Sequence, residues 1–208
     1  MRELIVQAFL TLDGVMQAPG GPEEDPDGGF DHGGWSFGYW DEQMQGVMGG
    51  ALSQPFDLVL GRRTYEIFAA HWPHSDEPGA ELFNSVTKHV ASRTLTEVEW
   101  ENSRLIEGDL AEGIRALKAQ DGPELQVHGS ANLIQTLLEH GLVDEFRVWI
   151  FPVVLGTGKR LFDGGTVPAG VELTSSQASS TGVIMATYRT GAEIRYGSFA
   201  NDPGEAQR

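Results

Sequence analysis

The sequence predicts a one-domain α/β protein whose mixed, mostly parallel sheet ends in an antiparallel hairpin. Three observations lead to this fold class. Short apolar runs alternate with helical patterns up to residue 156, strand patterns alone follow, and the 208 residues suit a single domain with a substantial core. We expect the domain to span residues 1–200 and residues 201–208 to form a disordered tail.

The first apolar run, residues 3–12, reads as a buried strand and is followed by an Asp13-Gly14 turn. Residues 17–40 are rich in Gly, Pro and Asp, with aromatic residues between them. A loop this long in a compact domain is usually functional or disordered, and its aromatic residues favour a loop that packs on the core. Asp41 then predicts the N-cap of a helix that runs to Leu52.

The middle of the chain alternates between short strands and helices. The predicted strands are residues 56–60, 88–92 and 102–107, and the predicted helices are residues 63–70 and 110–120. Asp109 and Glu112 have the spacing of a capping box at the start of the second helix.

The most informative stretch is residues 125–156. An apolar strand ends in Gly129-Ser130, and an amphipathic helix starts at once, with Leu133, Ile134, Leu137 and Leu138 at helical spacing. A second apolar strand begins near Phe146. A small-residue turn at a helix N-terminus lets backbone N–H groups approach a phosphate, so the unit points to a nucleotide-type ligand.

The last third of the chain shows strand patterns only. We predict strands at residues 171–179, 183–190 and 194–199, with Thr181-Gly182 as the turn between the first two.

Composition narrows the function classes. The formal net charge of −16 argues against broad nucleic-acid binding, because phosphate backbones need a basic patch. The absence of cysteine excludes disulfides, thiolate metal sites and a cysteine nucleophile. No apolar run approaches the ~20 residues of a membrane span and no signal-peptide pattern is present, so we expect a soluble cytoplasmic protein.

Three predicted strand ends carry residues suited to phosphate. They are Gly61-Arg62-Arg63-Thr64, Ser92-Arg93 and Gly129-Ser130-Ala131-Asn132. Because ligands of open α/β sheets bind beyond the carboxyl ends of the strands, these three turns can converge on one ligand. Lys159 and Arg160 are further candidates for anion contacts, with ordinary surface charge as the alternative.

At this point the chain resembles the dihydrofolate reductase-like family, and more closely the bacterial proteins related to the C-terminal reductase domain of bifunctional riboflavin-biosynthesis proteins. The matching motifs are Thr11-Leu-Asp-Gly-Val15, Leu60-Gly-Arg-Arg-Thr-Tyr-Glu66, Ser92-Arg93, Val127-His-Gly-Ser130, Leu142-Val-Asp-Glu145 and Pro152-Val-Val-Leu-Gly-Thr-Gly-Lys-Arg-Leu-Phe162. The resemblance covers nearly the whole chain except the tail. It implies NADPH binding, hydride transfer to a small-molecule substrate and, as one arrangement, a homodimer.

The resemblance also implies roles for single residues. Gly61, Arg62, Arg63 and Thr64 would hold the pyrophosphate and adenosine side, Ser92 and Arg93 the 2′-phosphate, and Gly129, Ser130, Ala131 and Asn132 the pyrophosphate. Ala8 would contact the nicotinamide through its backbone. The family turn is often Gly-Gly, and Ser130 fits it if its φ is negative.

Two aspartates are candidates for the catalytic side. Asp41 follows the aromatic loop, much as the folate-binding acid does in dihydrofolate reductases, and burial beside Trp35 and Trp40 would raise its pKa and let it donate a proton. A plain helix N-cap is the alternative. Asp13 is the second candidate, with a simple turn residue as the alternative.

Trp35 and Trp40 are candidates for stacking on the substrate or the nicotinamide, or for pinning the loop to the core. His71 and His74 have a metal-like spacing, but Pro73 prevents a helix that would present both, so we expect no metal site.

The leading hypothesis is therefore an NADPH-dependent reductase of a small pterin-, pyrimidine- or carbonyl/imine-type substrate. One alternative is the riboflavin-pathway reductase of 5-amino-6-(ribosylamino)uracil phosphate, although no Cys/His zinc motif of its deaminase partner occurs in the sequence. The other alternative is a nucleotide-binding module without catalytic activity.

Overall fold

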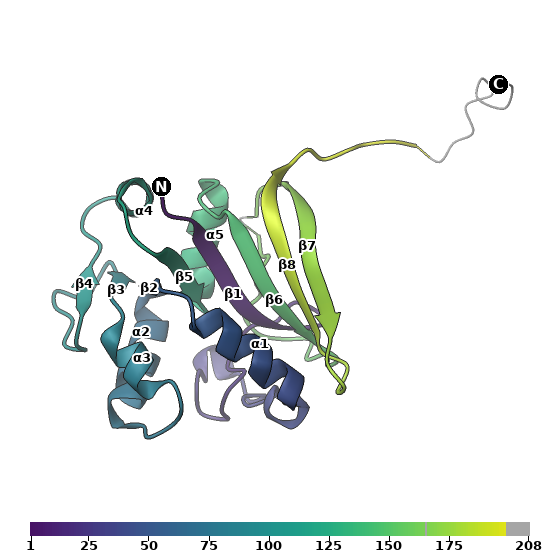
Figure 1. The fold of residues 1–208 in the computed structure, drawn as a ribbon, viewed down its shortest axis with the longest axis horizontal. Helices are drawn as coiled ribbons and strands as arrows, with labels where there is room; N and C mark the ends of the chain where they lie inside the picture. The colour runs from purple at the N-terminus through teal and green to yellow at the C-terminus, as the bar shows by residue number, and fades with distance from the viewer. Residues whose placement is uncertain (165, 199–208) are drawn as a thin grey trace, which may run out of the picture.

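The computed structural model describes residues 1–164 and 166–198, which build one eight-stranded sheet in the order β4-β3-β2-β5-β1-β6-β8-β7 (Figure 1). The strands are β1 Leu4–Thr11, β2 Phe56–Gly61, β3 Lys88–Ala91, β4 Ser103–Leu105, β5 Glu124–His128, β6 Glu145–Phe151, β7 Gly170–Ala178 and β8 Ile184–Ala192. The strands from β4 to β6 are parallel to one another, and β8 and β7 add an antiparallel hairpin next to β6. This arrangement confirms the predicted fold class.

Helices cover both faces of the sheet. They are α1 Glu42–Leu52, α2 Arg62–His71, α3 Ala80–Ser85, α4 Leu110–Ala119 and α5 Ala131–Glu139. Short 3₁₀ turns lie at Asp27–Gly29, Phe37–Tyr39 and Trp72–His74. Because side chains alternate along β1, Val6 and Ala8 join the core beneath α4 and α5, whereas Phe9 packs on the opposite face with Met44 of α1.

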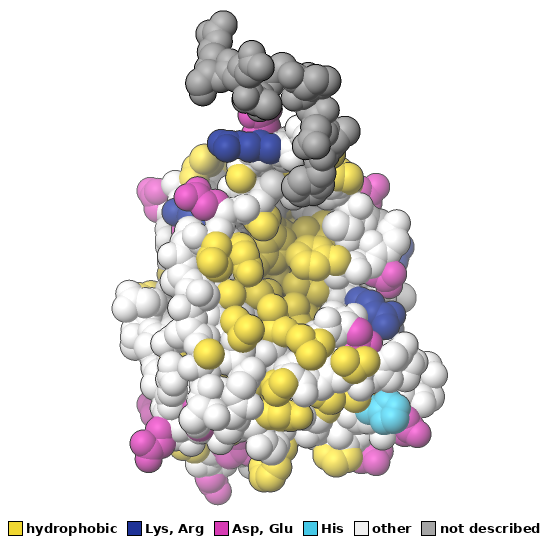
Figure 2. Space-filling view, turned by 90° about the vertical axis from the view of Figure 1, so that its right-hand side faces the viewer, with side chains coloured by type: hydrophobic (Ala, Val, Ile, Leu, Met, Phe, Trp, Pro, Cys, Tyr) yellow, Lys and Arg dark blue, Asp and Glu magenta, His cyan; other side chains and the backbone are white. Residues whose placement is uncertain are grey.

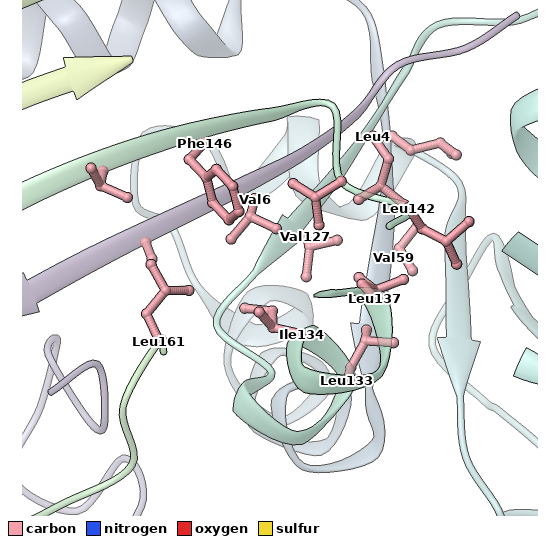
Figure 3. Close-up of a cluster of buried hydrophobic side chains, with 14 of the residues drawn as sticks. Leu4, Val6, Val59, Val127, Leu133, Ile134, Leu137, Leu142, Phe146 and Leu161 are labelled. Carbon is pink, nitrogen blue, oxygen red and sulfur yellow. The ribbon is translucent and has the colours of Figure 1, made fainter. Parts of the chain in front are cut away.

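The largest core lies between the sheet and α5. Leu133, Ile134 and Leu137 are almost fully buried and pack toward Val6 and Val127 of the neighbouring strands (Figure 3). Burial of each such side chain stabilises the fold by roughly 1.5–3 kcal/mol. The helical spacing of these residues therefore predicted correctly which face of α5 is buried.

Two predicted helix caps are present. Asp41 accepts a hydrogen bond from the Met44 N–H at 2.8 Å, and Asp109 accepts one from the Glu112 N–H at 2.9 Å. Both caps satisfy a backbone donor that the helix itself leaves without a partner.

The C-terminal prediction is right for the hairpin and wrong for the strand after it. Gly182 has a positive φ of 86° in the predicted turn. The predicted strand at 194–199 is absent from residues 194–198, although β7 is the last strand of the sheet. Tyr196 in this segment is 86% exposed, so little apolar burial stabilises a strand there. Residue 199 and the predicted tail 201–208 lie outside the described residues.

The hairpin side of the molecule carries exposed apolar side chains. Figure 2 views this side and shows apolar groups gathered in a hollow with charged groups at its margin. Val171, Leu173 and Ile184 of the hairpin are exposed, and Phe162, half exposed, packs edge-on against Phe146 at 5.6 Å. Within the described ranges, no helix is long and apolar enough to cross a membrane.

Candidate functional site

The three turns with residues suited to phosphate lie together at the carboxyl ends of the strands, as the sequence predicted. Strands β3, β2 and β5 are parallel neighbours, so the turns that follow them lie side by side. The Gly61 N–H donates to the Ser130 hydroxyl at 2.9 Å, which joins the turns after β2 and β5. The Arg62 Nη1 donates to the Thr94 hydroxyl at 2.6 Å, which joins the turns after β2 and β3.

The turn before α5 corrects one expectation. Ser130 has a φ of 66°, so the condition of a negative φ under which serine was expected to fit the turn is not met, and Gly129 before it has a φ of 56°. A side chain at Gly129 would start only 3.4 Å from the Thr64 hydroxyl. Ser130 tolerates the left-handed conformation because its hydroxyl accepts from Gly61 and donates to the His128 carbonyl at 3.2 Å.

Helices α2 and α5, which start at this edge, lack the side-chain caps that α1 and α4 have. Gly61 and Ser130 occupy their N-cap positions without a side-chain hydrogen bond to the helix. The backbone N–H groups of the first turns therefore remain available to an anion, and the helix dipoles favour negative charge there. These first turns contain the predicted Arg62, Arg63, Thr64, Ala131 and Asn132.

The cations at the edge differ in what they contact. Arg62 pairs with Glu66 at 2.7 Å, and Arg63 lies 3.4 Å from Asp25. The Ser92 hydroxyl accepts from the Leu95 N–H at 2.9 Å and from the Thr94 N–H at 3.2 Å, so it shapes the turn after β3. Arg93 is exposed, and within the described part of the chain it has no hydrogen bond or ion pair.

Ala8 is the first residue of β1 that no longer pairs with β5. The pairing of β1 with β5 ends at Gln7, opposite His128, whereas its pairing with β6 continues to Thr11. From Ala8 onward the β5-side edge of β1 is therefore unpaired with that strand. Backbone groups on such an edge can bind a ligand amide.

Asp13 is an anchor between two loops. Its carboxylate accepts from the Thr11 hydroxyl at 2.6 Å and from the Gly156 N–H at 2.8 Å, and it lies 3.3 Å from Arg160 Nη2. These hydrogen bonds, that from Thr11 first, lower the pKa of Asp13. The carboxyl stays ionised near neutral pH, which fits the turn-residue interpretation and not a proton donor.

Asp41 is likewise ionised, and its expected raised pKa is wrong. One carboxylate oxygen accepts from Met44, and the other accepts from the Ser180 N–H at 2.8 Å and the Ser180 hydroxyl at 2.7 Å. The Met44 N–H, followed by the Ser180 hydroxyl, lowers the pKa of this carboxyl. Asp41 therefore ties α1 to the β7–β8 turn, the N-cap role that was the alternative.

The two tryptophans pack on the sheet. The Trp35 Nε1 donates to the Gln17 carbonyl at 2.7 Å and its ring meets Phe151 edge-on at 5.3 Å, so it pins the loop to the core. Trp40 remains 36% exposed and contacts Phe9 at 5.7 Å and Trp149 at 5.6 Å.

Lys159 and Arg160 do not serve as free anion contacts, contrary to the expectation. Lys159 pairs with Asp25 at 2.7 Å and Asp27 at 3.0 Å, and Arg160 lies beside Asp13. Both cations hold the loop after β6 against the aromatic loop.

Sequence reasoning missed a groove between α1 and strands β6, β8 and β7. It has a volume of about 290 Å³. Its described lining consists of Gln7, Val47, Ala51, Arg147, Trp149, Ser175, Ser176, Gln177, Met185, Ala186 and Thr187. The available signal was the presence of Gln7 and Arg147 inside otherwise apolar strands. Gln7 directly precedes Ala8, so the groove adjoins the unpaired edge of β1.

The topology and the convergent strand ends define a dihydrofolate reductase-like α/β protein. The chain belongs to the RibD C-terminal domain family, whose profile matches residues 2–185. It is 30% identical over 196 residues to the uncharacterized protein YyaP of Bacillus subtilis, covering 90% of this chain and 94% of that protein.

Solved structures share the fold. A Shewanella sp. PV-4 protein with a riboflavin-biosynthesis assignment has a TM-score of 0.64 at 23% identity, covering 91% of this chain and 99% of that one. Dihydrofolate reductase from Enterococcus faecalis, complexed with NADP(H), has a TM-score of 0.57 at 14% identity, covering 91% and 97%.

The Ser130 hydroxyl is tested by a pair of substitutions. Ser130→Ala leaves the Gly61 N–H without its partner and keeps a side chain in the left-handed region, so we expect a loss of about 1–3 kcal/mol in the free energy of unfolding. Ser130→Gly loses the same bond but relieves the backbone, so it should be about 1 kcal/mol less destabilised. Urea unfolding measures both, and equal losses would contradict the strained turn.

A pair of substitutions tests whether the Asp13 carboxylate anchors the two loops. Asp13→Ala should cost about 1–3 kcal/mol of unfolding free energy because two backbone N–H groups and Arg160 lose their acceptor. Asp13→Asn keeps the shape and should cost less. Equal losses in Asp13→Ala and Asp13→Asn, or no loss in Asp13→Ala, would contradict this anchoring role.

The buried His128 should make the folded protein less stable at acidic pH. Burial lowers the pKa of His128 to about 4, from an ordinary value of 6.5. The unfolded chain then binds more protons below pH 6.5, so about 3 kcal/mol of stability should be lost as the pH falls from 6.5 to 4. Burial also lowers the pKa of His89, and that contribution remains in both proteins. His128→Gln should therefore flatten this part of the profile relative to wild type without removing its slope. If the free energies of unfolding of wild type and His128→Gln fall in parallel between pH 6.5 and pH 4, His128 is not the group responsible for the loss of stability.

Proposed function

We propose that this protein is an NADPH-dependent reductase of a small, flat substrate. The observation that carries the proposal is the meeting of three turns at one sheet edge, two of which begin helices with uncapped N–H groups. Membership of the RibD C-terminal domain family supports it, as does the fold shared with a reductase that was solved with NADP(H).

In this proposal the cofactor pyrophosphate lies between the starts of α2 and α5. Both helix dipoles point their positive ends at that position. The missing side chains of Gly61 and Gly129 let the two turns pack closely, since a Cβ there would lie 3.4 Å from Ser130 and from Thr64. The Ser130–Gly61 hydrogen bond fixes the distance between the two helix starts. The donor set therefore fits a diphosphate.

The 2′-phosphate is assigned to the turn after β3. Arg93 is exposed there, and Arg62 reaches the same turn through its hydrogen bond to Thr94. Two guanidinium groups at one turn match a phosphate monoester, since arginine forms bidentate hydrogen bonds to phosphate.

The nicotinamide is assigned to the β5-side edge of β1, at Ala8. NADPH bound there would supply the hydride, and the groove beside Gln7 would hold the acceptor molecule. Asp13 and Asp41 act in this proposal as positioning residues, because both carboxyls are ionised and bound to backbone N–H groups. Trp40 supports the groove through its contact with Trp149.

The alternative of a binding module without catalysis is separated by two measurements. Fluorescence titration with NADPH tests the cofactor site, and loss of NADPH absorbance over a pterin, pyrimidine and quinone panel tests turnover. Saturable binding with turnover supports the reductase, whereas saturable binding without turnover favours the binding module. No binding at millimolar NADPH contradicts both. The homodimer stays a prediction, which sedimentation velocity tests.

Arg93→Ala tests the assignment of the 2′-phosphate. We expect the dissociation constant for NADPH to rise about tenfold or more, because a charged hydrogen-bond partner is lost, while that for NADH stays nearly unchanged.

The control for this experiment is Arg115→Ala, which removes an exposed arginine on α4 that pairs with Glu112. It should leave both dissociation constants unchanged. Equal losses for NADPH and NADH in the Arg93→Ala protein would remove the assignment.

A further inference from the structure

A second groove lies between α2 and residues 95–100, the segment that follows the turn after β3. Its volume of about 570 Å³ falls within the range of ligand pockets, roughly 300–1,000 Å³. Among the described residues, it shares no lining residue with the groove beside α1. We call it the α2 groove, and the proposed reductase function assigns no role to it.

The floor of the α2 groove is apolar and fixed in place. Tyr65 and Trp100 line it, are each 6% exposed, and have ring centroids 6.3 Å apart. The Trp100 N–H donates to the Tyr65 hydroxyl at 3.0 Å, which ties residues 95–100 to α2. Leu95 and Val98 are half-buried and line the same groove. A preformed apolar surface of this kind lowers the ordering cost of binding.

The rim of the α2 groove is acidic. The charged side chains among its described lining residues are all carboxylates, those of Glu66, Glu97 and Glu99. Glu66 pairs with Arg62 at 2.7 Å. Glu97 and Glu99 are exposed and, in the part of the chain that the structure describes, have no hydrogen bond or ion pair. Two carboxylates at the rim therefore stand without a counter-ion.

One buried cation contacts the floor but does not pair with the rim carboxylates. The Lys88 ammonium lies 4.1 Å from the centroid of the Trp100 ring, and its side chain is fully buried. It donates to the backbone carbonyls of Asn84 at 2.7 Å and of Glu101 at 2.9 Å. The mouth of the groove therefore stays negative, and the net charge of −16 adds to this field.

We propose that the α2 groove docks a basic segment of a partner protein, whose apolar side chains fill the floor and whose lysine or arginine side chains pair with Glu97 and Glu99. Floor and rim select together, because apolar anchors supply affinity and complementary charges supply orientation and association rate. A second copy of this chain fits less well, since it carries 30 acidic against 14 basic residues. The inference goes beyond the proposed reductase function and does not depend on it.

Capped peptides test the docking by calorimetry on the full chain. The probe is a hexapeptide of repeated Lys-Leu pairs, one control peptide has serine in place of each leucine, and the other has glutamate in place of each lysine. We expect saturable binding of the probe that weakens at high salt, and binding of either control that is about tenfold weaker or more. Equal binding of the serine peptide would show attraction by charge alone and would overturn the proposal, as would no saturable binding at millimolar probe.

Paired variants place the binding on the surface. Glu97→Gln combined with Glu99→Gln removes two rim charges and should weaken binding of the probe about fivefold or more, since two ion pairs are lost. Glu139→Gln combined with Glu172→Gln removes the same charge from exposed positions on α5 and β7 and should leave the affinity nearly unchanged. Equal losses in the two double variants would overturn the assignment to the groove. A dimer in sedimentation velocity that only the first double variant dissociates would assign the groove to a second copy and would also overturn the proposal.

Discussion

The hydrogen bond from the Gly61 N–H to the Ser130 hydroxyl is the constraint on which the candidate site depends. Gly61 and Ser130 are far apart in the sequence, yet β2 and β5 are neighbours in the sheet. The bond holds the starts of α2 and α5 together, and it offsets the cost of a left-handed serine. A serine in this turn therefore stabilises a geometry that glycine would allow but not fix.

A second constraint acts through carboxylates that join distant loops. Asp13 holds the loop after β6, Asp25 binds Lys159 and lies near Arg63, and Asp41 binds the β7–β8 turn. Asp13 and Asp41 accept several hydrogen bonds, which lowers the pKa of both carboxyls, and Asp25 pairs with the Lys159 ammonium. In an acidic chain, acids near the site thus serve mainly to position loops around the sheet edge.

The sequence predicts local features well and long-range ones poorly. Helical spacing predicted the buried face of α5, and Asp41 and Asp109 predicted helix starts, because caps and periodicity depend on nearby residues. The pKa of Asp41 was predicted in the wrong direction because the carboxylate accepts first from the nearby Met44 N–H, the N-cap bond, and also from Ser180, which is remote in the sequence. The strand predicted at residues 194–199 is absent from residues 194–198 because a strand pattern does not reveal whether its apolar side chains find a surface to pack on, and Tyr196 remains exposed.

In the proposed cofactor site, the three turns after β2, β3 and β5 hold NADPH together. The most direct measurement is a set of amide ¹H–¹⁵N spectra of the wild-type protein recorded during titration with NADPH. If NADPH binds these turns, we expect the largest shifts at residues 61–64, 92–93 and 129–132, with the Gly61 and Ser130 amides saturating at the same concentration. Shifts confined to other parts of the chain, or none at millimolar NADPH, would contradict it.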